Sequence, residues 1–246
     1  MADQPRRSPR GGRAGQASRG PRRTDVDVAR LAALQVLKTV RVDDAYTNLV
    51  LPAVVSHFAL SPRDAAFVTE LASGSIRWRG TYDAVLGACI DRSLSKVEAK
   101  VLDVLRLGTH QLLAMRVPDH AAISTSVDLV RSTVSEGAAG FTNAVLRKVA
   151  AQDLESWIAQ VAPARERNPQ RHAEIAFSHP AWIVDELRKA VGAAELEALL
   201  AADNVPPKVT LVARPGRSTR DELPGTPTPY SPYGVTLEGG APGEVP

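Results

Sequence analysis

Few side chains in this sequence have a type and spacing suited to catalysis or metal binding. The single cysteine, Cys89, lies between Ala88 and Ile90 in an apolar helical run, where a buried and unreactive thiol is expected. The glycines of residues 11–15 follow no apolar strand, so they do not form a dinucleotide-binding loop. No metal-ligand spacing relates the five histidines, which are His57, His110, His120, His172 and His179. The sequence therefore predicts no catalytic, cofactor-binding or metal-binding residue.

Arginine is the residue type that indicates a function, because it gathers at the N-terminus. Residues 1–23 contain seven arginines and one acidic residue, a formal charge of +6, whereas the whole chain of 246 residues carries +3 and residues 24–246 therefore sum to −3. Cationic side chains bind nucleic-acid phosphates with strong salt dependence and little base readout. The predicted RNA contacts in this segment are Arg6, Arg7, Arg10, Arg13, Arg19, Arg22 and Arg23.

The same segment is rich in Gly, Pro and Ser and has almost no apolar side chain to offset the entropy of ordering. We expect residues 1–23 to be a disordered tail that binds RNA. The alternative is a tail that only makes the protein more soluble.

Two further sites are candidates for RNA binding. Arg30 lies at the start of the first expected helix, and Arg77 and Arg79 flank Trp78, the one aromatic residue with basic neighbours on both sides. An indole between cations is suited to stacking on an RNA base. The alternative interpretation is a core tryptophan at a helix end, with its arginines in solvent.

Helices must position these residues. Aromatic residues make up only 4% of a chain that is 44% hydrophobic, which is typical of a core of Leu, Val and Ala between packed helices. Ser61-Pro62 and the Ser95–Glu98 capping-box spacing predict helix starts, and Pro118 predicts a break. Apolar residues recur at helical spacing over about 25–40, 46–58, 62–78, 81–90, 97–115, 121–133 and 141–150. The sequence predicts a mainly α protein, with an all-helical bundle over residues 24–150.

The remaining residues have a different composition, with nine prolines in 206–246. Residues 151–178 are expected to be a linker with one short helix near 154–158. A helix is expected from His179-Pro180 to a C-cap at Gly192, followed by a short helix over 194–202. Lys208–Arg214 alternates like a strand, and nothing after it is expected to complete a sheet. We therefore expect 179–246 to be the incomplete start of an α+β, RRM-like subdomain.

Residues 105–148 carry the most specific pattern in the chain. It comprises Leu105, Arg106, Leu107, Gly108 and Gln111, then Val117-Pro118, then Gly140, Phe141, Asn143, Ala144, Val145, Leu146 and Arg147. This pattern resembles the NusB-like RNA-binding domain, in particular the version fused ahead of bacterial rRNA cytosine-C5 methyltransferases of the RsmB/Sun family. Most of these residues are expected to be structural, and Gly108 is expected to allow a close approach of two helices.

Three features favour the fused version of the domain over a standalone antitermination factor. Arg147 stands where standalone factors tend to have an acid. The segment beginning at His179-Pro180 and the strand near Lys208–Arg214 resemble the stretch that joins the NusB-like domain to the methyltransferase portion.

The resemblance implies ribosomal RNA as a partner and S-adenosylmethionine as the cofactor of a full-length enzyme. The enzyme family requires a glycine-rich cofactor loop and a cysteine nucleophile, and the chain has neither, so we expect it to be inactive alone. Without an apolar run of about 18 residues or a signal peptide, it is expected to be cytoplasmic and not membrane-bound.

Two alternatives remain open. One is a standalone NusB-type antitermination factor that binds RNA together with a small ribosomal protein. The other is a helical adaptor that binds an unidentified protein and no RNA.

Overall fold

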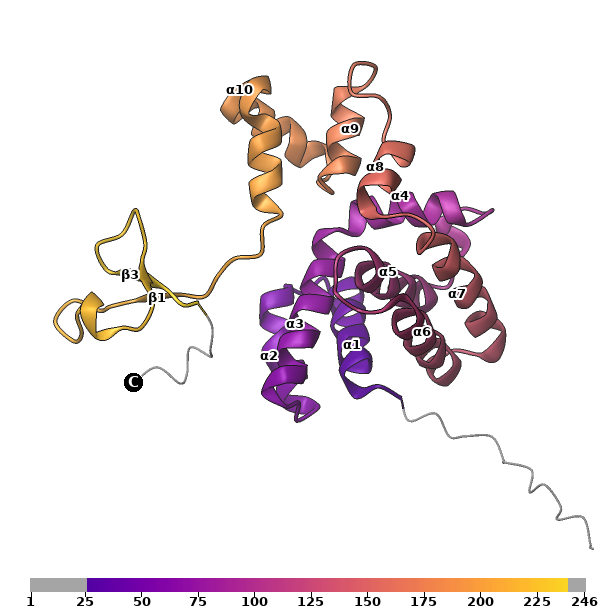
Figure 1. The fold of residues 1–246 in the computed structure, drawn as a ribbon, viewed down its shortest axis with the longest axis horizontal. Helices are drawn as coiled ribbons and strands as arrows, with labels where there is room; N and C mark the ends of the chain where they lie inside the picture. Colours follow the sequence, from indigo (N-terminus) through magenta and orange to yellow (C-terminus); the bar gives the residue numbers. More distant parts are fainter. Residues whose placement is uncertain (1–25, 239–246) are drawn as a thin grey trace, which may run out of the picture.

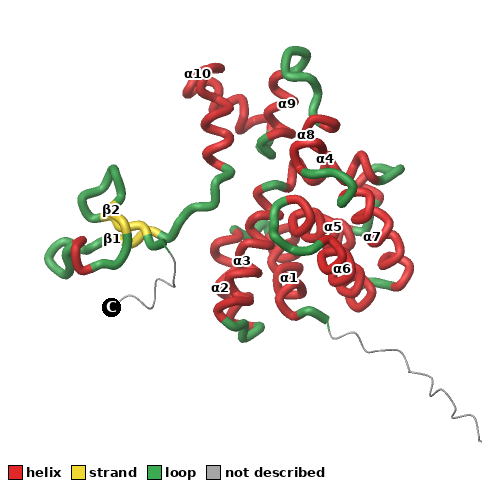
Figure 2. Tube along the Cα trace, in the orientation of Figure 1, coloured by secondary structure: helices red, strands yellow, loops and turns green. Residues whose placement is uncertain are grey.

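A computed structural model describes residues 26–238, and these residues form a mainly helical protein (Figures 1 and 2). Seven helices form the first part: α1 (Val28–Asp43), α2 (Thr47–His57), α3 (Pro62–Arg77), α4 (Arg79–Cys89), α5 (Ala99–Leu113), α6 (Asp119–Thr133) and α7 (Glu136–Val149). Helix α5 packs against α1, α3, α4, α6 and α7, so it forms the centre of the bundle. The predicted fold class is confirmed.

Side-chain caps explain where several helices begin. Ser61 accepts a hydrogen bond from the Asp64 amide at 3.2 Å, as its position before Pro62 predicts. The predicted capping box at Ser95 is wrong: Leu94–Lys96 form a short 3-10 turn, and α5 begins only at Ala99. Val97, which is extended and buried, anchors this turn in the core and so delays the helix.

Helices α5, α6 and α7 approach each other closely at a point where α5 has a glycine. A Cβ atom on Gly108 would lie 2.7 Å from Cδ1 of Leu146 and 3.1 Å from Oγ of Ser126, so glycine is needed where α5 meets α6 and α7. Pro118 separates α5 from α6 as expected. Helix α7 begins at Glu136, earlier than expected, because Ser135 caps it and two glycines are tolerated in its first turns.

The segment expected to be a linker contains two helices, α8 (Leu154–Val161) and α9 (Pro169–Ala176). Helix α8 confirms the short helix expected near 154–158, whereas the expectation of no further helix before residue 178 is wrong. Trp157 of α8 is buried and donates a hydrogen bond from Nε1 to the Val149 carbonyl oxygen at 2.8 Å. Asn168 caps α9, and Ile175 is buried. These anchoring contacts explain why a segment of polar composition is ordered here.

Helix α10 (Ala181–Asp203) contains the turn that the sequence indicates at Gly192, where φ is 78°. The turn divides α10 into two arms that pack with α9 around a second small core. This core consists of Ala173, Val184, Leu196 and Leu200. The C-terminal helices form a unit of their own beside α4 (Figure 1).

A small antiparallel sheet follows an extended segment (Figure 2). Its strands are β1 (Thr210–Val212), β2 (Thr226–Pro227) and β3 (Gly234–Thr236), in the order β1-β3-β2, with Leu211 opposite Val235. The expectation that nothing completes a sheet after the first strand is wrong. Strands of two or three residues are too short to show alternation, but Val235 and Leu237 are buried.

Candidate RNA-binding surface

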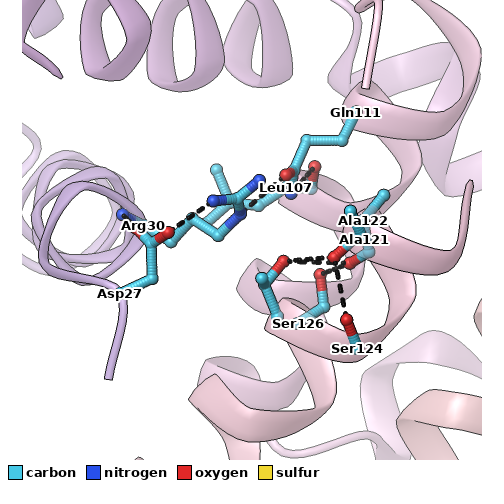
Figure 3. Close-up of polar contacts among 9 residues, drawn as sticks. Asp27, Arg30, Leu107, Gln111, Ala121, Ala122, Ser124 and Ser126 are labelled. Carbon is cyan, nitrogen blue, oxygen red and sulfur yellow. Dashed lines mark hydrogen bonds and ion pairs between the residues drawn. The ribbon is translucent and has the colours of Figure 1, made fainter. Parts of the chain in front are cut away.

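Arg30 occupies the start of α1, and the bundle holds its side chain in place (Figure 3). Its Nε donates a hydrogen bond to Oε1 of Gln111 at 2.7 Å, and its Nη1 pairs with Asp27 at 2.6 Å. The guanidinium carbon lies 4.9 Å from the centroid of the Phe67 ring. The side chain is 11% exposed. Arg30 therefore joins α1, α3 and α5, and its contact with RNA stays a prediction.

Gln111 explains part of the sequence pattern on α5. Its side chain is buried. Its Nε2 donates a hydrogen bond to the Leu107 carbonyl oxygen at 3.2 Å, and its Oε1 accepts the hydrogen bond from Nε of Arg30 (Figure 3). Buried polar groups are stable only with such partners. Gln111 is thus a structural residue of the bundle.

A hollow of about 500 Å³ adjoins Arg30 at the start of α1. Its lining includes Asp27, Arg30, Phe58, Arg63 and Phe67. Arg63 is exposed and was missed by the sequence analysis; its place at a helix start beside Pro62 was the available signal. The seven tail arginines lie outside the described residues.

Trp78 lies between α3 and α4, where it is half-buried. Its ring stacks on Tyr82 with 6.5 Å between the centroids. This arrangement matches the alternative of a tryptophan packed at a helix end. Arg79 is exposed and lines a hollow of about 540 Å³ together with Arg171 and His179. Contact of Arg77 and Arg79 with RNA stays a prediction.

An ionic network that the sequence analysis missed ties three helices together. Arg106 of α5 binds both carboxylate oxygens of Asp83 at 2.8 Å and also pairs with Asp103 at 3.2 Å. Arg41 of α1 pairs with Asp103 at 2.9 Å. Asp103 is 2% exposed. The available signal in the sequence was Asp103 and Arg106, an acid and a base three residues apart among the apolar residues of α5.

His110 and Tyr82 form a buried polar pair. The Tyr82 hydroxyl lies 2.8 Å from Nδ1 of His110, and Nε2 has no hydrogen-bond partner. Burial, together with the positive charge of Arg77, lowers the pKa of His110 to about 4, although Glu70 acts in the opposite direction. The contact of 3.6 Å between Nε2 and Glu70 is therefore not an ion pair at neutral pH.

The buried imidazole predicts acid sensitivity. Between pH 6.5 and about 4 the unfolded chain protonates this histidine and the folded chain does not, so stability falls as pH falls through this window. We expect the wild-type protein to lose about 2 kcal/mol more unfolding free energy between pH 7 and pH 5 than the His110→Gln variant loses. Urea titrations at the two pH values measure this. His120→Gln, at an exposed position, should behave like wild type, and an equal loss in all three proteins would contradict the assignment.

Cys89 is buried, as expected. Burial raises the pKa of its thiol, and Lys148 offsets this rise in part. The same lysine donates to the Cys89 carbonyl oxygen at 2.9 Å and so binds the C-terminal end of α4. A protonated thiol is a poor nucleophile, so Cys89 is not suited to covalent catalysis.

Within residues 26–238, no group of three or more His, Cys, Asp or Glu side chains is arranged to hold a metal ion. None of the helices described there has the length and apolar character needed to cross a membrane.

The NusB family model matches residues 27–151, which span α1 to α7 and amount to half of the chain. The chain belongs to the NusB family. Gly108, Gln111 and Arg106 lie within the matched residues, and each supports the bundle. The transcription antitermination protein NusB of Bradyrhizobium is 33% identical over 152 residues, which cover 54% of this chain and 90% of that protein.

Other relatives match beyond the NusB domain. A Mycobacterium tuberculosis protein whose name assigns it to the methyltransferases, without a substrate, is 47% identical over 93% of this chain and 51% of its own length. The ribosomal RNA small subunit methyltransferase B of Pseudomonas putida is 31% identical over 78% of this chain and 41% of its own length. The chain thus spans about half the length of these relatives. The resemblance to the RsmB/Sun family is confirmed.

The crystal structure of PH0851 is similar in fold, with a TM-score of 0.59 at 10% sequence identity. The similarity covers 88% of this chain and 50% of that chain, so the shared fold includes elements beyond the NusB domain.

Proposed function

We propose that this chain is the RNA-binding N-terminal part of an S-adenosylmethionine-dependent 16S rRNA cytosine-C5 methyltransferase. The observation that carries the proposal is the extent of the match to ribosomal RNA small subunit methyltransferase B. That match covers 78% of the chain and therefore includes residues outside the NusB domain, whereas the antitermination protein matches only 54%. In this function the bundle and its basic tail hold ribosomal RNA.

The described residues do not fit the cofactor or the chemistry. Cys89 is buried with a raised thiol pKa, and no glycine-rich loop follows a strand between residues 26 and 238. S-adenosylmethionine supplies the methyl group in this enzyme class. We propose that its binding site corresponds to the part of the methyltransferase relatives that this chain does not match. The role of this chain is to bind and orient RNA in the cytoplasm.

The purified chain should therefore bind RNA without transferring a methyl group to it. We expect fragments of 16S rRNA to bind in fluorescence anisotropy titrations, more tightly than 23S rRNA fragments of equal length. We expect no labelled methyl group to appear in the RNA when S-adenosylmethionine is added. Turnover by the chain alone would refute the assignment of chemistry to other residues, and absence of RNA binding would refute the proposal itself.

The second candidate is a NusB-type antitermination factor, favoured by the match to 90% of the Bradyrhizobium protein. Such a factor should bind leader RNA in preference to 16S rRNA, and a small ribosomal protein should strengthen that binding. The same titrations, repeated with both RNAs and with the added protein, separate the two functions.

A further inference from the structure

The chain turns sharply between α9 and α10, at Phe177–Pro180. Ser178 in this turn has φ of 58°, in the left-handed region that glycine adopts readily and other residues rarely do. A residue holds this conformation only where its surroundings impose it. The contacts of Ser178 and its neighbours show what imposes it here.

The first contact joins the turn to the NusB-like bundle. Helix α4 begins after Trp78, which supplies no side-chain cap. The hydroxyl of Ser178 accepts hydrogen bonds from the amides of Gly80 at 2.9 Å and Thr81 at 3.4 Å, so it caps α4 from a distant part of the sequence.

Helix α4 in turn donates a side-chain hydrogen bond to α9. The hydroxyl of Thr81, which is fully buried, donates to the carbonyl oxygen of Ile175 in the last turn of α9. Each helix end thus satisfies backbone groups of the other. Gly80 suits this close approach, because a Cβ there would lie 3.2 Å from Oγ of Ser178, a tight contact.

A second set of contacts joins the turn to the far end of α10. The carbonyl oxygen of Phe177 accepts a hydrogen bond from Nδ2 of Asn204 at 2.8 Å and lies 2.6 Å from Nδ1 of His179. The turn at Gly192 brings the second arm of α10 back to this point. Asn204 directly follows α10 and precedes the extended segment that leads to β1.

We infer that Phe177–Pro180 is a rigid joint, with Ser178 as its positioning residue. The joint makes α1–α10 one body and fixes the direction in which the chain leaves toward the sheet. This inference rests on the proposed function: an enzyme that binds RNA with its bundle gains accuracy when whatever follows is held at a constant orientation to that RNA.

Distances between spin labels test the joint in the full chain. With Cys89→Ala as background, cysteines replace Ala144 on α7 and Ala198 on the second arm of α10, both of which are exposed. The parent protein should give one narrow distance distribution. Ser178→Ala and Ser178→Gly should both broaden it, because both remove the hydroxyl although glycine suits the backbone better. Asn204→Ala, which leaves the cap of α4 in place, should also broaden it.

Amide exchange supplies a second readout. Loss of the Ser178 cap should speed exchange at Gly80 and Thr81 by about fivefold to tenfold, the factor typical of a lost helix cap. Ser135→Ala is the matched control, since Ser135 caps α7 through the Ala138 amide at 3.2 Å and has no part in the joint. It should speed exchange only in α7 and leave the distance distribution narrow.

A narrow distribution in both Ser178 variants, with circular dichroism unchanged, would overturn the inference. RNA affinity measured on the same variants should equal that of the parent. Failure of RNA binding in every variant, the parent included, would count against the proposed function but not against the joint, which the distances decide independently.

Discussion

Removal of residues 1–23 is expected to weaken RNA binding on the order of 100-fold at low salt and to flatten its salt dependence. The segment carries +6, whereas residues 24–246 sum to −3, so we expect long-range attraction to RNA to come from residues 1–23. We do not expect all seven arginines to contact phosphate at the same time. Loss of about two to four phosphate contacts accounts for the expected drop in affinity. Each contact contributes roughly 0.7–0.9 to the slope of log K against log salt concentration.

A charge-preserving variant is the matched control for this deletion. Replacing the seven tail arginines with lysine should keep most of the affinity, while replacing them with glutamine should reproduce the deletion. Titrations at several salt concentrations measure both slope and affinity. Unchanged affinity and slope in the deleted protein would mean that the tail only aids solubility, and the RNA site would then be a local basic patch on the helices.

Arg106→Met is expected to destabilise the protein by about 3–5 kcal/mol, because it leaves two carboxylates without their shared cation. Asp103 is almost fully buried, and Arg41 alone would remain to pair with it. Asp83 would lose both of its bonds to the guanidinium. Urea denaturation followed by circular dichroism measures the cost.

Arg131→Met provides the comparison, since Arg131 also pairs with two acids but is exposed. Surface pairs of this kind contribute about 0–1 kcal/mol, so this variant should unfold almost like wild type. Similar costs for the two substitutions would show that the buried network does not hold α1, α4 and α5 together.

Local patterns predict most of the bundle, since apolar residues recur at helical spacing in each of its helices and a few helices also have a start or stop signal. The cap at Ser61, the break at Pro118 and the turn at Gly192 follow from single-residue preferences. Helix α9 has a local start signal, Asn168 before Pro169, which the sequence analysis missed. The sheet is different, because β3 pairs with β1 and β2 across loops of the chain, and no local pattern shows such pairing.

The same limit applies to the candidate RNA contacts. Arg30 at a helix start is compatible with phosphate binding, but its partners Gln111 and Phe67 come from other helices. Trp78 between two arginines suggests stacking on a base, whereas its observed neighbour is Tyr82. Composition identifies the basic tail, but only the fold shows which cations of the bundle are already engaged.

The contact between Gly74 and His110 has a consequence for the history of this family. A Cβ atom at position 74 would lie 2.1 Å from Nε2 of the imidazole, so no larger residue fits there while His110 keeps its place. An ancestor that acquired alanine at 74 would have needed either a shorter side chain at 110 or a displaced imidazole. The two positions should therefore covary among homologues, and lineages that lack the histidine are the ones in which the glycine is free to change.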